Sequence, residues 1–417
     1  MNARVAACFC AAVISLKAIV LVGGYATRLF PISLRTPKAL LPVAGEPILS
    51  IIVGKLAAAG INDVIVSLAT SQRFIEECIG RKAAGATVHY CYEESSHEGE
   101  KPGAIGAISQ AVDKFGADDY VIVGGDNFFD GLDLRKVMEF KQKTNAPAVI
   151  VFHELADKNL VSLYGIAALD PKGRITKFQE KPKVEEAVST LASTAVYVVG
   201  KDFVGNRLPE FIRHKAKAGE KADRLGDLWH YFLDKLPLLG FTYQGTWGDL
   251  NTCASYIELN KVVMNLMKKP RIEGAVDRSA TIREPVIIEK GAVVGKNAVV
   301  GPYVHLMGGA EVGEGATVEG SIVFDGAKIC ANAVVKDSLV DGNAVVGEGT
   351  HVDSYCMLGY GSKLGKNARM LGGSAVWPFV EAGDDAVVEG KIDIPEEIFR
   401  DRLAKSGFWA KRARAKH

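Results

Sequence analysis

Apolar residues in the first 125 positions form short runs that alternate with longer amphipathic segments. The short runs predict buried strands at 18–22, 64–68, 87–92 and 120–123. The amphipathic segments predict helices at 47–59, 71–82 and 104–115. Pro47 stands at the first position of its helix and Gly60 just past its end, which is the usual placement of these residues. Strands separated by helices of this length are typical of βαβ units, so we predict an α/β fold with a Rossmann-like, mostly parallel sheet.

The same alternation continues to about residue 268. Further strands are predicted at 148–153, 191–199 and 241–245. Helices are predicted at 133–145, at 252–268 and, as a pair, within 202–236. The tetrapeptide at 170–173 separates two alternating runs and predicts a hairpin turn. We therefore assign 17–268 to one domain.

Beyond Pro270 the pattern changes to an internal repeat of six residues. Aliphatic residues recur at Val276, Ile282, Ile288, Val294, Val300, Leu306, Val312 and Val318. The register slips by one near Phe324, Ile329 and Val335, and resumes at Val340, Val346, Val352, Leu358, Leu364 and Met370. The repeat resembles the hexapeptide repeat of left-handed parallel β-helices, in which three hexapeptides form one triangular coil. We predict such a β-helix over 270–390, with five to six coils.

The two ends of the chain differ from these domains. Residues 1–16 contain an arginine and an apolar run, which resembles a short signal peptide. The run leads directly into the first strand and is broken by Ser15 and Lys17, so we favour an N-terminal extension and predict no membrane span. Residues 391–417 predict a helix and a basic tail.

Composition narrows the class of protein. The formal net charge of +1 argues against a nucleic-acid-binding protein. Seven cysteines occur without a CxxC pair, so neither a disulfide framework nor a zinc site is indicated. The simplest interpretation is a cytoplasmic location.

The strand at 18–22 ends in a glycine-rich loop with residues that could bind phosphate. Gly23 and Gly24 follow the strand, Arg28 comes five residues after Gly23, and Lys38 follows ten residues later. Backbone N–H groups at the end of a parallel strand can bind phosphate, and Arg and Lys can neutralise a polyphosphate. The spacing matches neither of the two common phosphate-binding loops.

The string GGYATRL…PK…LLPVAGEPI resembles the signature of sugar-1-phosphate nucleotidylyltransferases, the nucleoside-diphosphate-sugar pyrophosphorylases. The usual form is GGxGTRL…PK, and Ala26 stands where glycine is usual. The resemblance implies an enzyme and assigns nucleotide binding to Gly23, Gly24, Thr27, Arg28 and Lys38. It also implies a nucleobase loop, which Pro102 and Gly103 match in part. A glutamine that often precedes this loop has no clear equivalent here.

Two aspartates are the candidate metal ligands. Asp126 ends the apolar run VIVGGD, at the edge of the sheet where open α/β proteins bind ligands. A carboxylate facing a triphosphate needs a cation, for which Mg²⁺ is the usual choice. The segment TWGDLNT resembles the family's W-x-D-x-G-T, so Asp249 is the second expected ligand and Asn251 replaces a glycine. With Arg28 and Lys38, these aspartates form the predicted catalytic set.

The sugar phosphate is assigned by a second pair of motifs. Tyr164-Gly165 and Glu180-Lys181 match the family's YG…EKP pair, in which the glutamate binds sugar hydroxyls and the lysine binds the sugar phosphate. A phosphate with about two negative charges needs a cationic partner, which Lys181 supplies. Ala195 replaces a usual glycine in the neighbouring strand.

The resemblance implies transfer of a nucleotidyl group from a nucleoside triphosphate to a sugar-1-phosphate, with release of pyrophosphate. UTP or dTTP with glucose-1-phosphate is favoured, and GTP with mannose-1-phosphate is the next choice. Two further hypotheses are a non-catalytic regulatory subunit and a bifunctional enzyme whose β-helix acetylates an amino sugar phosphate through His305 or His351. We expect a homo-oligomer assembled through the β-helix, with no nucleic-acid or membrane partner.

Overall fold

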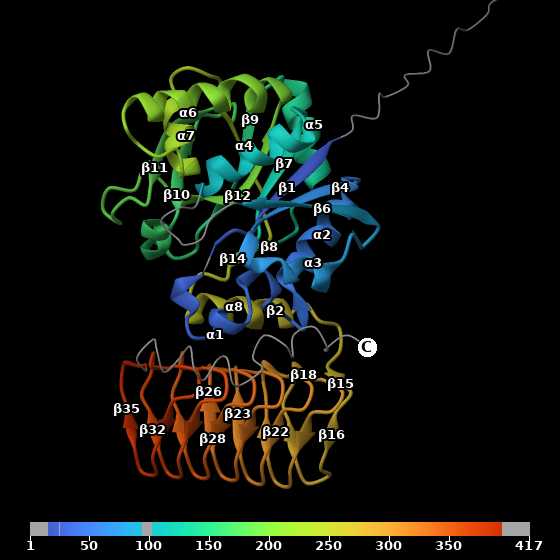
Figure 1. Cartoon of the computed structure of the whole chain (residues 1–417), viewed down its shortest axis with the longest axis vertical. Helices are drawn as coiled ribbons and strands as arrows, with labels where there is room; N and C mark the ends of the chain where they lie inside the picture. Colours follow the sequence, from blue (N-terminus) through green and yellow to red (C-terminus); the bar gives the residue numbers. More distant parts are fainter. Residues whose placement is uncertain (1–15, 25, 94–101, 394–417) are drawn as a thin grey trace, which may run out of the picture.

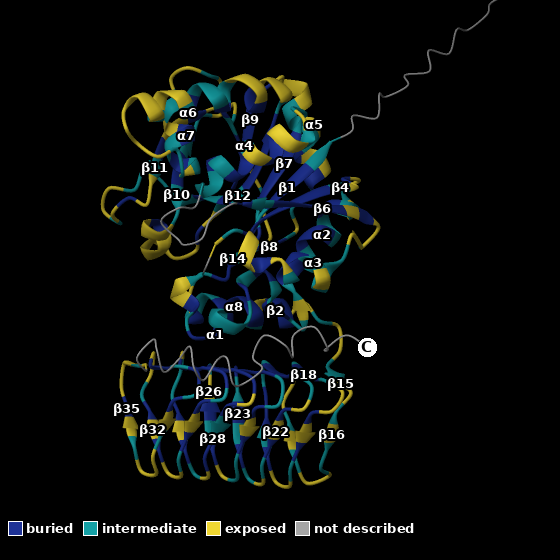
Figure 2. Cartoon of the chain, viewed as in Figure 1, coloured by how far each residue is buried: buried dark blue, intermediate teal, exposed yellow. Residues whose placement is uncertain are grey.

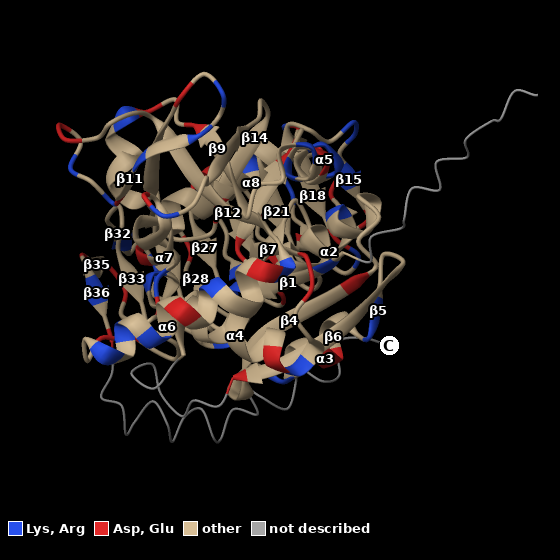
Figure 3. Cartoon of the chain, turned by 90° about the horizontal axis from the view of Figure 1, so that it is seen from above, with Lys and Arg blue, Asp and Glu red and all other residues tan. Residues whose placement is uncertain are grey.

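The computed structural model describes residues 16–24, 26–93 and 102–393 (Figure 1). An α/β domain lies against a prism of short strands, and the buried residues gather in the sheet and inside the prism (Figure 2). Acidic and basic positions are interspersed over the helices and loops (Figure 3). The predicted extension, apart from Leu16, and most of the predicted C-terminal tail lie outside the described residues. No helix in the described ranges is long and apolar enough to cross a bilayer.

Four parallel strands form the centre of the large sheet. They are β1 (Lys17–Leu21), β4 (Asp63–Ala69), β6 (Ala86–Glu93) and β7 (Tyr120–Gly124). β1 lies between β4 and β7 and pairs parallel with both. Its middle residues are fully buried, as expected for a parallel strand covered on two faces. The Rossmann-like prediction is therefore confirmed.

The sheet becomes mixed beyond β7. The additional strands are β9 (Ala148–Glu154), β10 (Gly165–Leu169), β11 (Ile175–Glu180), β12 (Leu191–Val199) and β13 (Leu239–Thr242). β12 pairs antiparallel with β7, β9 and β10. β10 and β11 form the hairpin predicted at 170–173.

Helices cover the two faces of this sheet. They are α2 (Ile48–Ala58), α3 (Phe74–Ile79), α4 (Gly103–Phe115), α5 (Leu134–Thr144), α6 (Leu208–Lys217) and α7 (Leu225–Phe232). A further helix, α8 (Cys253–Met264), lies between the sheet and the prism (Figure 1). A capping box between Thr252 and Ser255 fixes the start of α8. The helix predicted at 71–82 is shorter because Gly80, at φ 78°, ends α3.

The prism consists of short parallel strands from β15 (Arg271–Ile272) to β36 (Lys391–Ile392). Within the described residues they form three sheets of eight, seven and seven strands, consistent with the predicted left-handed β-helix. Paired residues lie 18 positions apart in most coils, as in Val276 and Val294. The prediction of five to six coils is too low, because each sheet contains at least seven strands.

One face of the β-helix packs beneath α8 and the short helix α1 (Ile32–Arg35) (Figure 1). The apolar core of the α/β domain continues onto this face through Ile322, Phe324, Leu339, Met357 and Ala375. The register slip determines which side Phe324 faces. Val323 occupies the inside of the coil after Val318, so its neighbour Phe324 joins the core of the α/β domain.

Replacing Phe324 with alanine is expected to destabilise the chain by about 3–5 kcal/mol, because it removes a buried aromatic side chain between two bodies. The thermal unfolding midpoint measures the effect. Val293→Ala is the control, since Val293 is 45% exposed on an outer face, and a change within about 0.5 kcal/mol is expected. Equal shifts in the two variants would contradict this role of Phe324.

Candidate functional site

A cavity of about 330 Å³ lies at the carboxyl ends of β1 and β7. Its lining includes Gly24, Thr27 and Arg28 from the glycine-rich loop, together with Lys38, Asp126 and Asn251. Parallel strands direct their carboxyl ends to one edge of a sheet, which is where open α/β folds bind ligands. The structure therefore brings together most of the predicted catalytic set at this cavity.

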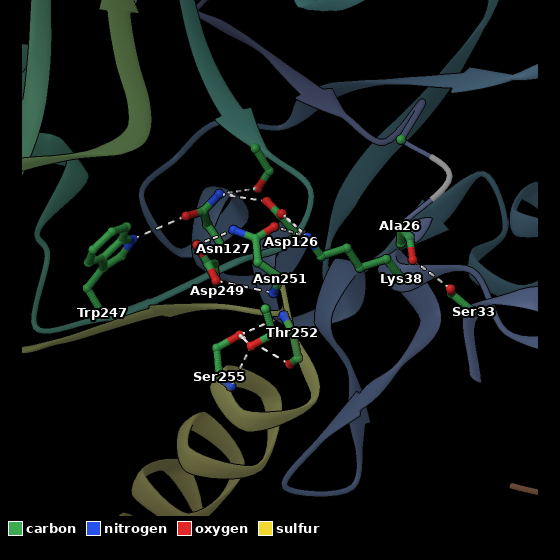
Figure 4. Close-up of polar contacts among 12 residues, drawn as sticks. Ala26, Ser33, Lys38, Asp126, Asn127, Trp247, Asp249, Asn251, Thr252 and Ser255 are labelled. Carbon is green, nitrogen blue, oxygen red and sulfur yellow. Dashed lines mark hydrogen bonds and ion pairs between the residues drawn. The ribbon is translucent and has the colours of Figure 1, made fainter. Parts of the chain in front are cut away.

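A chain of polar contacts links Lys38, Asp126, Asn251 and Asp249 (Figure 4). The Lys38 ammonium forms an ion pair with Asp126 and donates to Asn251 Oδ1 at 2.6 Å. The Asn251 amide nitrogen donates to Asp249 Oδ2. Asn251 thus links Asp249 to Lys38, and Lys38 links this group to Asp126.

Two facing strands explain why the aspartates meet. β14 (Thr246–Asp249) pairs antiparallel with β8 (Asn127–Asp130), and Asp249 lies opposite Asn127. Asn127 donates to Asp126 Oδ1 at 2.8 Å and accepts from Trp247 Nε1 at 3.1 Å. These bonds fix the Asp126 carboxylate at the turn between β7 and β8.

Asp249 is 4% exposed. Burial raises the pKa of its carboxyl, and the nearby negative charge of Asp126 raises it further. Lys38 and hydrogen bonds from Asn251 and Tyr164 act in the opposite direction. A buried carboxylate next to a second one requires a cation to remain charged.

The donor set is compatible with a magnesium ion. Among the described residues no three His, Cys, Asp or Glu side chains cluster as metal ligands. The available oxygen ligands are the carboxylates of Asp126 and Asp249 and the side-chain amide of Asn251. Mg²⁺ is commonly held by one or two carboxylates together with substrate phosphates.

A second cavity, of about 270 Å³, lies near the first. Ala195 in its lining would be 3.2 Å from a Cβ on Gly124, and Gly125 lines the first cavity. The second cavity is also lined by Tyr164, Gly165 and Glu180, and by α7. Partial desolvation raises the pKa of Glu180, and Lys181 lowers it. Lys181 itself is exposed, and its backbone N–H donates to the Tyr164 carbonyl at 3.0 Å. Tyr164 also hydrogen-bonds to Asp249, so it joins the two cavities.

Ala26 and Ala195 share an unusual backbone conformation. Their φ angles are 53° and 52°, in the left-handed region that favours glycine. Both replace a glycine of the resembling pattern, and each lines one of the two cavities. The backbone therefore keeps the glycine conformation at both positions, at a cost for alanine of about 1 kcal/mol each.

The predicted nucleobase loop falls partly outside the described residues. Pro102 precedes α4, and a Cβ on Gly103 would lie 2.4 Å from Asp223. Gly23 lies against Glu93, the last residue of β6, and a Cβ there would lie 2.5 Å from both carboxylate oxygens. Ser67 donates to Glu93 at 2.9 Å, and Glu93 is 3% exposed.

Sequence reasoning missed two polar groups of this region. Asn251 replaces a glycine of the resembling pattern, and no local signal predicts its link between Lys38 and Asp249. Glu93 is absent from the predicted site, although an acidic residue at the end of an apolar strand is a detectable signal.

The two histidines of the β-helix differ: His305 is fully buried and lies 2.7 Å from Glu289, whereas His351 is exposed.

Comparison with known proteins defines the class. The nucleotidyl transferase family model matches residues 17–265, so the chain belongs to the nucleotidyl transferase family. Residues 282–393 match the GMPPB C-terminal domain model.

Relatives with curated names carry three different nucleotide specificities. A UTP--glucose-1-phosphate uridylyltransferase of Synechocystis sp. is 27% identical, covering 79% of this chain and 88% of the relative. A glucose-1-phosphate thymidylyltransferase of Streptomyces antibioticus is 28% identical, covering 80% and 89%. A mannose-1-phosphate guanylyltransferase of Mycobacterium tuberculosis is 26% identical, covering 76% and 82%.

A solved structure supports the fold of the first domain. The crystal structure of a putative glucose-1-phosphate thymidylyltransferase from Bacillus anthracis has a TM-score of 0.52 and 24% identity. It covers 59% of this chain and 94% of that one.

Ala26→Gly is expected to stabilise the chain by up to about 1 kcal/mol, because glycine adopts the left-handed conformation without strain. The thermal unfolding midpoint measures this. Ala107→Gly in the interior of α4 is the control and is expected to cost at least about 1 kcal/mol, since glycine weakens a helix interior. Destabilisation of both variants to the same extent would contradict strain at Ala26.

Proposed function

We propose that this nucleotidyl transferase moves a nucleotidyl group from a nucleoside triphosphate to a sugar-1-phosphate and releases pyrophosphate. The observation that carries the proposal is the pair of neighbouring cavities. One contains Arg28, Lys38 and Asp126, and the other contains Tyr164 and Glu180. The names of the relatives support the same reaction class.

The sugar phosphate oxygen attacks the α-phosphate in line, and pyrophosphate leaves from the opposite side. Arg28 and the loop N–H groups hold the triphosphate, and Lys38 neutralises charge at the reacting phosphates. Glu180 binds sugar hydroxyls, and Lys181 holds the attacking phosphate. Asp126 and Asp249 would hold Mg²⁺, which polarises the α-phosphate when bound.

The nucleobase is left open by the relatives, and a pyrimidine triphosphate with glucose-1-phosphate remains a prediction. GTP with mannose-1-phosphate is the second candidate, which the name of the guanylyltransferase relative and the match to the GMPPB C-terminal domain model support.

The β-helix is proposed to serve assembly, and the homo-oligomer remains a prediction. An acetyltransferase function through His305 is disfavoured, because an acceptor cannot reach a fully buried imidazole. His351 is exposed and remains the alternative for that activity.

Asp126→Asn and Asp249→Asn are each expected to lower the rate of pyrophosphate release at least about 100-fold, because each removes a charge that would hold the metal ion. Release is measured with Mg²⁺ across UTP, dTTP, GTP, ATP and CTP, each paired with glucose-, mannose- and N-acetylglucosamine-1-phosphate. Asp130→Asn is the matched control, since Asp130 lies on β8 and pairs with Lys55 at 2.8 Å. Near-normal rates in both aspartate variants would contradict the assignment of Asp126 and Asp249 as metal ligands.

A further inference from the structure

Two segments that supply the main cavity rest directly on the β-helix. Segment 26–38 carries Arg28 and Lys38, and α8 begins four residues after Asp249. Phe30 in the first segment contacts Trp377 edge-to-face, with ring centroids 6.1 Å apart. Cys253, the first residue of α8, lies against the Cys356 carbonyl. The β-helix is therefore in contact with both sides of the site.

Arg35 lies three residues before Lys38 and contacts several residues of the β-helix. Its guanidinium binds both carboxylate oxygens of Asp325, at 2.6 and 2.7 Å, and Asp341 Oδ1 at 3.0 Å. It also lies over the Tyr360 ring, 4.9 Å from the centroid. Residues of three successive coils therefore contact the side chain of Arg35.

The contact between Arg35 and Asp341 is buried and closely packed. The Asp341 side chain is fully buried, and the Arg35 side chain is 15% exposed. Burial raises the pKa of Asp341 to about 6, so its charge near neutral pH depends on Arg35. A Cβ on Gly342 would lie 2.2 Å from Arg35 Nη1, so glycine is required for the close approach. Partially buried bidentate pairs of this kind fix geometry far better than surface ion pairs.

We propose that Arg35 is a positioning residue, through which the β-helix holds segment 26–38 so that Arg28 and Lys38 face Asp126 and Asn251. The inference rests on the proposed roles of Arg28 and Lys38. It makes the β-helix a working part of the nucleotide site, besides any role in assembly.

A second ion pair across the same interface provides a matched control. Lys261, near the end of α8, lies 2.8 Å from Asp337 of the β-helix, and its side chain is 19% exposed. Lys261 lies on α8 and is remote in sequence from segment 26–38. Losing this pair weakens the interface without releasing segment 26–38.

The first experiment compares Arg35→Met with Lys261→Met. For Arg35→Met, kcat is expected to fall at least about tenfold and KM for the nucleotide to rise, because misplacement of about 1 Å can cost 100-fold. KM for the sugar phosphate is expected to stay within about twofold, since Tyr164 and Glu180 lie on other elements. Lys261→Met is expected to leave all three constants within about twofold. Equal losses in the two variants would overturn the proposal.

Hydrogen–deuterium exchange provides a readout that needs no turnover. Arg35→Met is expected to raise exchange in a peptide covering 26–38, and Lys261→Met is not. If the wild type releases no pyrophosphate with any substrate pair, the proposed function fails, and this exchange result still decides whether Arg35 tethers the segment. Unchanged exchange in Arg35→Met would overturn the proposal by itself.

A triple variant separates positioning from simple charge compensation. Arg35→Met leaves Asp341 as an unpaired buried charge, which can lower stability and obscure the kinetics. R35M/D325N/D341N removes that charge and is expected to regain most of the lost thermal stability. Its kcat is expected to remain at least about tenfold low, because the tether is still missing. Recovery of kcat together with stability would show that Arg35 is merely structural.

Discussion

Two carboxylates of like charge, Asp126 and Asp249, lie close together at the main cavity, and Asp249 is almost completely buried. Their repulsion is balanced by the Lys38 ammonium and by the Asn251 amide, which come from segments more than 200 residues apart in the chain. The balance holds only if three separate segments keep their relative positions. The ladder between β8 and β14 fixes the aspartates, and the loop after β1 has to bring Lys38 to them.

The β-helix supplies the remaining rigidity. A single apolar core extends from the parallel sheet, through α8, to the outer face of the prism. The prism is closely packed inside, with aliphatic and alanine side chains along its coils, so it can act as a firm support for the segments that rest on it. Arg35 adds a directional polar contact to this apolar interface.

Much of the architecture could be predicted from periodicity. The apolar run of β1 and the six-residue repeat both reflect a simple geometric rule, which is burial on two faces or on the inside of a coil. The loop with Arg28 and Lys38 could also be placed, because strand ends in a parallel sheet share one edge. The catalytic roles of these residues remain predictions.

Features that depend on pairing in space could not be predicted. Nothing local in the sequence pairs β14 with β8 or places the Asn251 amide between two charged groups. The left-handed backbone of Ala26 follows from the loop path, although alanine does not favour it. Phe324 fits the repeat by composition, and only the exact coil length decides that it faces the α/β domain.

The contacts of Arg35 also affect the order in which parts of the chain can fold during synthesis. Its two carboxylate partners lie 290 and 306 residues further along the chain. At a synthesis rate of about 5–20 residues per second, the segment around Lys38 leaves the ribosome roughly 15–60 s before Asp341 has been made. The parallel sheet can form during that interval, but the loop with Arg28 and Lys38 has to wait for the coils that hold it. The main cavity is thus completed late in synthesis, although Arg28 and Lys38 are among the first residues to be joined.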